Sequence, residues 1–465
     1  MEVQPDPMTS NSLLRSLVLG GVLALLGASA YAQQNKTIAI VGGMLINGTN
    51  TPPIHNAVVV IQGDKIVQAG PAMRVKVPPG ADVIDANGKT VLPGLIDAHN
   101  HSILVGWGEE GGFFEWLKGH PEYPLEKVMA LSQYQLLMAG VTSSIDVGGP
   151  AKESIDLRDR INKGEIAGSR MIVSGPMVAR NAYRGFPEDA SYAIKSSEDG
   201  AREVNMLAKM GVDIIKAHSG LTREDYAAIV QAAHANHIKV HAHLYDEPAL
   251  KNAFETGVDV LQHVGSAGQP TYSPALVQAI AAAGRPVVPT VAHRAYLYPD
   301  TIDFPESLQD PELKSLFPKG MWEGLQQSLK EWRNLGYFRG IVSEMEYRDP
   351  LTKQWINSGA VVGMGTDNGT PMNFHTDALW REMKAFSDLG MPALTVITDA
   401  TAVNAKIMDR PDLGTIEAGK TADIIIVPDN PLYDHLSDLG HVETVIKSGV
   451  IYKRDGKPLF PMPLN

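Results

Sequence analysis

The chain has 465 residues, 44% hydrophobic and 20% charged, which is typical of a globular protein with a sizeable core. Its formal net charge of −12 argues against general nucleic-acid binding. It has no cysteine, which excludes disulfides, thiolate ligands and cysteine nucleophiles, so any metal must be bound by His, Asp, Glu or a modified Lys.

The N-terminus has the pattern of an export signal. Arg15 precedes an apolar run from Ser16 to Ala28, and Ala30-Tyr31-Ala32 follows as an A-x-A cleavage pattern. The run is too short for an ordinary transmembrane helix. We therefore expect residues 1–32 to be a signal peptide of an exported protein without a stable membrane anchor. The periplasm is the expected location, secretion is an alternative, and an uncleaved N-terminal anchor is a further one.

Both ends of the chain beyond this signal alternate short apolar runs with turn residues, which predicts β-structure. The runs are Thr37–Val41 and Ala57–Ile61 near the N-terminus, and Ala422–Val427, His441–Ile446 and Gly449–Tyr452 near the C-terminus. Neither end alone is expected to build a core, and chain termini often lie close together. We therefore predict that residues 37–90 and 409–465 form one composite β-sandwich domain.

Between these ends, short apolar strands alternate with helical patterns, which indicates βα units and a parallel sheet. The strand candidates are Val91–His99, Val141–Asp146, Arg170–Ser174, Asp213–Lys216, Lys239–His243, Val258–His263, Pro286–Val291 and Val361–Asp367. Helical stretches include Leu125–Met138, Ser197–Met210, Thr222–Asn236 and Ala249–Thr256. Eight βα units predict an α/β protein with a TIM barrel over residues 91–408.

The connection from His293 to Ala360 is longer than the others. It contains four large aromatic residues, Trp322, Trp332, Tyr337 and Trp355. Its sequence is compatible with a lid, with a subunit contact, or with an extended helical layer, and it does not decide among them.

Polar residues end five of the predicted strands, where barrel active sites lie. They are His99 and His101 after the first strand, Lys216 after the fourth, His241 and His243 after the fifth, His263 after the sixth and Asp367 after the eighth. Alternate residues of a strand point to one face, so the paired histidines are well placed to bind a divalent metal together. One barrel histidine alone is more often structural, but agreement among five strand ends predicts a metal centre.

Four motifs carry a resemblance to a known family. They are PGLIDAHNH at residues 93–101, GVDVLQH at 257–263, GTD at 365–367 and DLGTIEAGKTAD at 412–423. With these motifs the chain resembles the amidohydrolase superfamily over nearly all of residues 37–460. It looks most like the imidazolonepropionase-like branch, which includes metal-dependent Xaa-Pro dipeptidases and ochratoxin-hydrolysing amidases.

The resemblance implies two divalent ions, with zinc expected, and a ligand for each strand end. His99 and His101 match the ligands of the more buried ion, and His243 and His263 match those of the more exposed ion. Lys216 matches a lysine that is carboxylated to bridge the two ions, since a free ammonium would repel them. Asp367 matches a ligand that is also the general acid/base.

Two further histidines are candidates for positions next to the ligands. His241 could take the role of His243, but the resemblance favours the second histidine of the pair and leaves His241 beside the ligands or in the core. His218 follows Lys216 by two residues and either faces the same site or forms an ordinary loop hydrogen bond.

Candidate substrate contacts follow the third, fifth, seventh and eighth strands, where an Arg or His could bind a carboxylate. They are Tyr183, Arg184, Tyr245, His293, Arg294 and His375. His293 and His375 follow their strands most closely, and His375 also matches a histidine found after the GTD motif in this branch. The aromatic residues of the loop 106–114 either line an apolar pocket or belong to a flexible loop that packs on its own barrel.

The resemblance therefore implies an amidase or dipeptidase that uses a metal-bound hydroxide on dipeptide-like or N-acyl amino acid substrates, ochratoxin-type amides included. The alternatives are a cyclic-amide hydrolase or deaminase of the same superfamily, or a non-catalytic scaffold. The intact Lys216 disfavours the mononuclear deaminases, and the complete ligand set disfavours a scaffold. The resemblance also implies a homo-oligomer acting on a small molecule.

Overall fold

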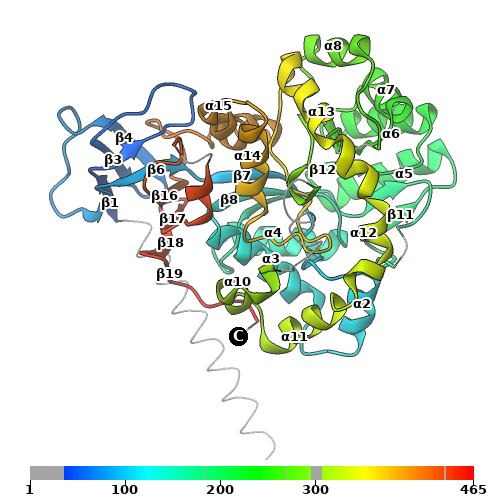
Figure 1. The fold of residues 1–465 in the computed structure, drawn as a ribbon, viewed down its shortest axis with the longest axis horizontal. Helices are drawn as coiled ribbons and strands as arrows, with labels where there is room; N and C mark the ends of the chain where they lie inside the picture. Colours follow the sequence, from blue (N-terminus) through cyan, green and yellow to red (C-terminus); the bar gives the residue numbers. More distant parts are fainter. Residues whose placement is uncertain (1–35, 184, 266–267, 295–305, 434–435, 465) are drawn as a thin grey trace, which may run out of the picture.

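The computed structural model describes residues 36–183, 185–265, 268–294, 306–433 and 436–464 (Figure 1). The predicted signal peptide, residues 1–32, lies outside these ranges, and so does Arg184. Among the helices of the described ranges, none combines the length and the apolar character that a bilayer crossing requires. The fold is a mixed α/β fold.

The two ends of the chain form two sheets with a common core. The first sheet has the order β4-β3-β1-β5, and the second has the order β19-β18-β17-β16-β6-β2. The strands are β1 (Thr37–Val41), β2 (Met44–Leu45), β3 (Ala57–Gln62), β4 (Lys65–Pro71), β5 (Asp82–Asp85), β6 (Lys89–Pro93), β16 (Ile424–Pro428), β17 (Thr444–Lys447), β18 (Val450–Arg454) and β19 (Lys457–Pro458). One buried cluster takes Ile40 and Val59 from the first sheet and Ile424 and Ile446 from the second. Figure 1 shows the blue and red strands side by side.

The parallel strands lie in two further sheets, with the orders β7-β8-β9 and β11-β10-β12-β13-β14-β15. The strands are β7 (Leu95–Asn100), β8 (Val141–Asp146), β9 (Arg170–Val173), β10 (Met177–Ala179), β11 (Ser191–Ala193), β12 (Ile214–Ala217), β13 (Lys239–His243), β14 (Val260–Gln262) and β15 (Val287–Val288). Most residues of these strands are buried, as in strands covered on both faces, although β8 and β13 carry several polar residues and β11 is partly exposed.

These sheets do not by themselves confirm the predicted barrel. The predicted strand Val361–Asp367 is wrong as a regular strand, because residues 361–368 pair with their neighbours only through isolated parallel bridges at Val362 and Asn368. Backbone hydrogen bonds nevertheless join the sheets. The N–H of Asp213 donates to the carbonyl of Val173 at 2.9 Å, and that of Ala98 donates to the carbonyl of Met364 at 3.0 Å. One buried cluster draws side chains from β7, β8, β12, β14 and β15.

The predicted single strand Val91–His99 is also wrong, because it is two strands in two different sheets. β6 pairs antiparallel with β16 of the terminal sheet, whereas β7 pairs parallel with β8. Gly94 separates them, and a Cβ at this position would lie 2.2 Å from Oγ1 of Thr142. Only glycine allows this close approach, so the chain changes sheets here.

The helices that follow the parallel strands agree well with prediction, and side-chain caps mark the start of three of the four predicted ones. α3 (Leu125–Met138) and α5 (Ser197–Met210) have the predicted bounds, and α6 (Arg223–Ala235) and α7 (Glu247–Thr256) differ by at most two residues at each end. A capping box joins Thr222 and Asp225 at the start of α6. The other helices of this region are α2 (Glu110–Lys118), α4 (Ala151–Asn162), α8 (Pro274–Ala282), α14 (Ala378–Asp388), α15 (Ala393–Thr398), η4 (Asp399–Val403) and α16 (Asn404–Ile407), with η5 (Ser437–Gly440) among the C-terminal strands.

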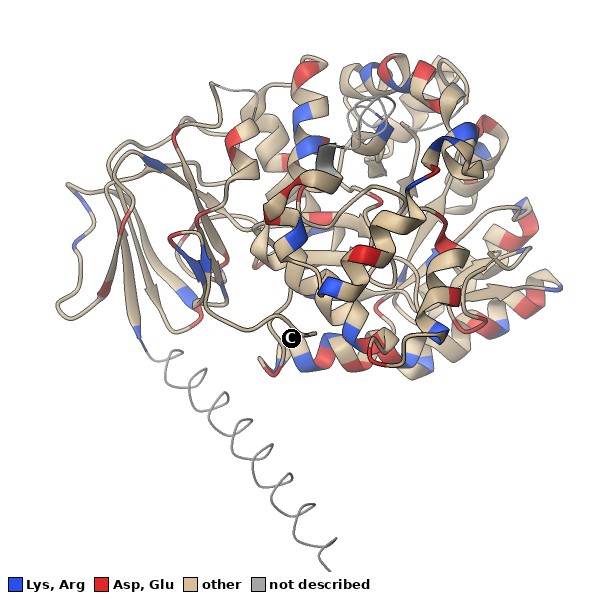
Figure 2. Ribbon diagram, turned by 60° about the horizontal axis from the view of Figure 1, so that its bottom comes forward, with Lys and Arg blue, Asp and Glu red and all other residues tan. Residues whose placement is uncertain are grey.

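The described part of the long connection after His293 is a series of helices. They are η2 (Glu306–Gln309), α10 (Pro311–Ser315), α11 (Lys319–Ser328), η3 (Trp332–Asn334), α12 (Gly336–Gly340) and α13 (Val342–Ser358). Trp322, Trp332 and Trp355 are all buried, which favours the extended helical layer among the alternatives. Figure 2 shows charged residues of both signs on the helices around the molecule, while the strands are largely uncharged.

Candidate metal centre

The predicted site residues meet because parallel strands end at one edge. In adjacent strands, Lys216 pairs with His241 and His243 pairs with Gln262. His263 comes directly after β14, and the backbone of Asp367 bonds to the carbonyl of His99 at 2.9 Å. Gly365 allows this last approach, since a Cβ there would lie 2.9 Å from the Cβ of His99.

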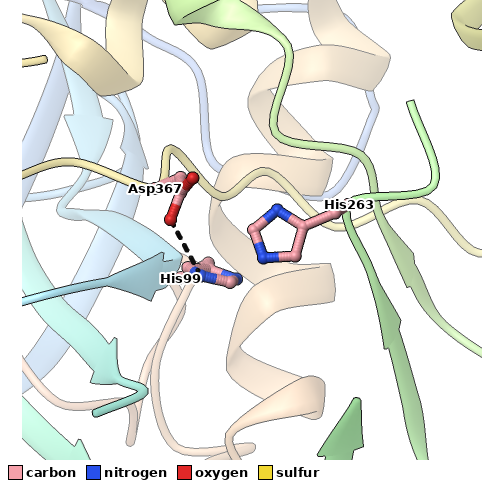
Figure 3. A group of neighbouring side chains, drawn as sticks. All are labelled: His99, His263 and Asp367. Carbon is pink, nitrogen blue, oxygen red and sulfur yellow. Dashed lines mark ion pairs between the residues drawn. The ribbon is translucent and has the colours of Figure 1, made fainter. Parts of the chain in front are cut away.

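Three of these side chains form the tightest group. One potential ligand atom from each of His99, His263 and Asp367 lies within 4.8 Å of the other two (Figure 3). Oδ1 of Asp367 lies 3.3 Å from Nε2 of His99 and 3.2 Å from Nε2 of His101. The group therefore joins histidines from both predicted ligand sets to one carboxylate.

Further imidazoles extend this group toward the surface. The ring of His243 lies 4.3 Å from that of His263 and 4.1 Å from that of His218, measured between centroids. The ring of Tyr245 lies 4.5 Å from that of His243. His243 keeps partial exposure, whereas His99 is fully buried. His263 is 1% exposed and His101 is 7% exposed, so burial alone does not separate the two predicted ligand pairs.

The charges of the group suit a divalent cation. Burial lowers the pKa of His99 to about 3 and holds the pKa values of His243 and His263 well below the ordinary range, so these rings are neutral. Burial opposes ionisation of Asp367, but His263 and hydrogen bonds from His101 and His99 hold its pKa well below the usual value. Neutral imidazoles beside a carboxylate are the protonation states that a metal requires.

Unused nitrogen atoms give a second sign that the residues fit a metal. Nδ1 of His99 and Nδ1 of His101 are buried, and neither has a hydrogen-bond partner among the described residues. Buried polar atoms are normally paired, because leaving one unpaired costs roughly 1–3 kcal/mol. A cation in this centre is therefore chemically consistent with the donors present.

Lys216 lies at the base of the centre and is 1% exposed. Its Nζ donates to Oε1 of Gln262, and Nε2 of Gln262 lies 3.2 Å from Nδ1 of His241. Burial lowers the pKa of Lys216 to about 7, so a substantial fraction of the amine is uncharged at neutral pH. His241 thus contacts the ligand candidates through Gln262, while the ring of His243 packs directly among them.

The predicted substrate contacts divide into two groups. His293 joins the centre, with Nε2 3.8 Å from Oδ2 of Asp367, and the ring of Tyr245 packs on His243. Arg294 is 1% exposed and donates from Nε to Glu344 at 2.5 Å, so its charge is already paired.

Tyr183 and His375 lie on other sides of the centre. The ring of Tyr183 meets His218 edge-on at 5.4 Å. His375 is buried, and burial lowers its pKa to about 3.

The aromatic residues of the loop 106–114 pack on one another and on neighbouring segments, with the ring of Phe114 5.3 Å from that of Phe186. The ring of Phe113 lies 5.3 Å from that of Trp107 and 6.5 Å from that of Trp116. Phe113 and Trp107 are buried. These contacts favour a packed loop over an open apolar pocket wall.

The structure adds residues that sequence reasoning missed. Asp97 accepts bonds from the backbone N–H of His99 at 3.0 Å and from the hydroxyl of Thr366 at 2.7 Å. Glu382 on α14 accepts from the backbone N–H groups of Val291 and Ala292 at 2.8 and 2.6 Å. The sequence could have indicated Asp97, because this residue is a carboxylate two positions before a candidate ligand in a buried strand. Nothing in the sequence indicates Glu382, because its hydrogen-bond partners lie about 90 residues away along the chain.

Thr290 is the missed residue with the clearest chemical consequence. Its hydroxyl donates to the carbonyl of Pro289 at 2.8 Å and lies 2.9 Å from Nδ1 of His263, which must then carry the proton. Nε2 of His263 is left as the nitrogen with the free lone pair. Thr290, His263 and Asp367 all have positive φ, at 54°, 64° and 59°, which costs about 1–3 kcal/mol each for such residues.

Thr290→Val is therefore expected to weaken metal binding by about 10–100-fold, because the acceptor for Nδ1–H is lost while the side-chain shape is kept. Thr290→Ser is the matched control and should bind like wild type. Competition with a chromophoric chelator measures both affinities. Equal affinity of the Val and wild-type proteins would remove Thr290 from any role in orienting His263.

Comparison with known proteins places this geometry in context. The model of the amidohydrolase family matches residues 90–452. A 5-methylthioadenosine/S-adenosylhomocysteine deaminase of Halothermothrix orenii is 24% identical over 449 residues, 88% of this chain and 92% of the relative. An imidazolonepropionase of Streptomyces griseus subsp. griseus is 23% identical over 391 residues, 84% of this chain and 90% of the relative.

Solved structures share the fold. A Xaa-Pro dipeptidase with methionine bound in its active site aligns with a TM-score of 0.70 at 24% identity, covering 90% of this chain and 100% of its own. Ochratoxinase from A. niger aligns with a TM-score of 0.68 at 20% identity, covering 90% of this chain and 96% of its own.

Proposed function

The chain belongs to the amidohydrolase family, and on this premise we propose that it is a binuclear metal-dependent amidase acting on dipeptide-like or N-acyl amino acid substrates. Members of this family are metal-dependent hydrolases of carbon–nitrogen bonds, and the His/His/Asp group at the strand ends is the observation that carries the proposal. The family and the fold leave the substrate open, and the dipeptide-like class rests on likeness to dipeptidase and ochratoxinase structures.

We propose that β7, β8, β9, β12, β13, β14, β15 and residues 361–368 close into one TIM barrel within residues 91–408. Hydrogen bonds at three junctions support closure: Asp213 to Val173, Val287 to Val361, and Ala98 to Met364. Residues 37–90 and 409–465 would then form the composite β-sandwich. We also propose that residues 1–32 are a signal peptide that directs the protein to the periplasm.

In the proposed centre, His99 and His101 hold the more buried ion, and His243 and His263 hold the more exposed one. Bound divalent ions, with zinc proposed, would lower the pKa of a water molecule and polarise the substrate carbonyl. Lys216 is proposed to be carboxylated: its uncharged amine adds to carbon dioxide and loses a proton, which gives an oxygen ligand. Its lowered pKa favours this reaction.

Asp367 is the proposed general acid/base. It takes a proton from the attacking water and passes it to the leaving nitrogen. Its carboxylate lies against histidines of both proposed ligand pairs, which places it where the attacking water would be activated. No nucleophilic side chain is needed.

A second candidate function is deamination or cyclic-amide hydrolysis. The relatives named as deaminases and as an imidazolonepropionase favour it. The buried Lys216 beside the histidines favours the binuclear amidase instead, because a bridging carbamate serves two ions. An amidase releases an amino acid, a deaminase releases ammonia, and a cyclic-amide hydrolase opens the ring of its substrate and releases neither.

The metal-loaded protein is expected to contain about two divalent ions per chain and to lose activity on chelation. A panel of Xaa-Pro and Xaa-Arg dipeptides, N-acyl aromatic amino acids and adenosine derivatives, assayed for free amino acid and for ammonia, tests the substrate class. Amino acid release from the amides supports the proposal, and ammonia release from adenosine derivatives alone would replace it with the deaminase. Failure to bind metal after reconstitution would favour a non-catalytic scaffold.

A further inference from the structure

Glu110 is a carboxylate near the metal centre that has no part in the proposed mechanism. It is the first residue of α2 and is only partly exposed. Burial, with the charges of Asp367 and Glu109, raises the pKa of its carboxyl to about 8, although a hydrogen bond with Tyr183 opposes the change. Within the described ranges, the charged groups that act on Glu110 are therefore carboxylates, and none is a cation.

Contacts of the residues on either side fix the position of Glu110. Oε1 of Glu109 accepts a hydrogen bond from the N–H of Gly336 at 3.0 Å, which joins the start of α2 to α12 (Figure 1). A Cβ on Gly185 would lie 2.7 Å from Cα of Gly111, so the backbone after Glu110 touches the segment between β10 and β11. Glu110 thus lies between the long helical connection and the loop that follows β10.

Tyr183 connects Glu110 to the imidazoles of the centre. Its phenol bonds to the carboxyl of Glu110, and its ring meets that of His218 edge-on at 5.4 Å. The ring of His218 in turn lies 4.1 Å from that of His243. Glu110 and Asp367 are both among the charges that raise the pKa of Tyr183. The Glu110 carboxyl therefore lies one tyrosine away from the nearest imidazole.

A partly buried carboxylate without a cationic partner suits a cationic ligand. Ionising such a group is unfavourable, because burial removes the water that would stabilise the charge. A bound ammonium or guanidinium group would supply the missing counter-charge and donate a charge-assisted hydrogen bond. The phenol oxygen of Tyr183 could accept from the same group. The alternative is a protonated Glu110 that bonds only to Tyr183, and it would not distinguish charged from neutral substrates.

We infer that Glu110 is a specificity-determining residue that binds a cationic nitrogen of the amide substrate, an inference that rests on the proposed function. The nitrogen is either the free α-ammonium on the acyl side of the amide or the charged side chain of the amino acid that is released. The protein would then prefer dipeptides that carry this positive charge over neutral N-acyl amino acids, ochratoxin-type amides included.

Two matched pairs of amides, each differing by one ammonium group, test this inference with the zinc-loaded full chain. Alanyl-leucine against N-propionyl-leucine tests the acyl side, and N-propionyl-lysine against N-propionyl-norleucine tests the released amino acid. Wild type is expected to favour the charged member of one pair by about 10–100-fold in kcat/KM, the contribution of a hydrogen bond to a charged group. The pair that shows the preference identifies the position of the cation.

Three variants assign the preference to the carboxylate. Glu110→Gln should lower the preference to near unity, because the amide keeps the size of the side chain but carries no charge. Glu110→Asp should retain part of it. Glu115→Gln is the matched control, because Glu115 lies on the same helix, has a 73% exposed side chain and pairs with Lys118. It should keep the wild-type preference.

The inference is overturned if wild type hydrolyses both members of each pair equally or favours the neutral ones, or if Glu110→Gln keeps the wild-type preference. Equal loss of activity on both members of a pair in Glu110→Gln would assign Glu110 a structural role and overturn it as well. Failure of the proposed function would look different, because wild type would then hydrolyse none of the four amides, and the inference would fall with it.

Discussion

Asp367→Asn is expected to lower kcat for amide hydrolysis by about a thousandfold while the protein keeps its metal. The amide retains the shape of the side chain and one ligand oxygen, but it cannot take a proton from water. Asn also tolerates the left-handed backbone at this position, where φ is 59°, so the strand end should not move. Steady-state kinetics on the preferred amide and elemental analysis of the same sample measure the two properties.

Asp156→Asn is the matched control for this change, because Asp156 is a 57% exposed carboxylate on α4 that pairs with Lys152 outside the centre. It should have wild-type kcat. An Asp367→Asn protein with intact metal and full kcat would assign the proton transfer to another group. Loss of the metal together with activity would make Asp367 essential as a ligand and leave its role in proton transfer to a pH–rate profile.

The candidate site could be located from sequence because each polar residue interrupts or ends an apolar strand. His99, His263 and Asp367 each follow such a run, and parallel strands bring their ends together. The bounds of α3 and α5 could likewise be predicted, since periodicity defines the helical segments and, for α5, a serine cap and a left-handed glycine mark the two ends.

What sequence could not predict depends on contacts between distant segments. Gly94 divides one apolar run into β6 and β7 because Thr142 packs against it, and nothing local to Gly94 reveals that neighbour. Thr290 contacts His263 through one hydrogen bond, and Glu382 accepts from the backbone N–H groups of Val291 and Ala292; both contacts form only once the strands are assembled. The eighth strand position is irregular because Asp367 and its neighbours bend toward the centre instead of continuing a ladder.

A buried ion pair involves Asp423, the last residue of the motif at 412–423, where the chain enters β16. Nη1 of Arg170, at the start of β9, donates to Oδ2 of Asp423 at 2.6 Å. The same guanidinium donates to the hydroxyls of Ser143 and Ser448 at 2.7 and 2.8 Å. Asp423 also accepts from the backbone N–H of Ser448 and, through its carbonyl, from Gly94. The pair therefore joins the parallel strands to the terminal sheet.

Asp423→Ala is expected to lower the free energy of unfolding by about 3–5 kcal/mol, because it leaves a buried guanidinium without its counter-charge. Arg170 and Asp423 have side chains only 8% and 4% exposed, so water cannot replace the lost partner. Denaturant titration followed by tryptophan fluorescence measures the change. Asp82→Ala is the matched control, because Asp82 pairs with Arg454 at 3.2 Å with 35% of its side chain exposed. It should cost less than about 1 kcal/mol.

The double variant Arg170→Met/Asp423→Leu separates the two possible sources of this loss. If the cost of Asp423→Ala comes from the unpaired buried charge, removing both charges should restore much of the stability, since apolar residues of similar size need no counter-ion. If the cost comes from the hydrogen bond that the Asp423 carboxylate accepts from the backbone N–H of Ser448, the double variant should remain as unstable as the single one. An Asp423→Ala protein no less stable than Asp82→Ala would show that the pair does not hold the two sheets together.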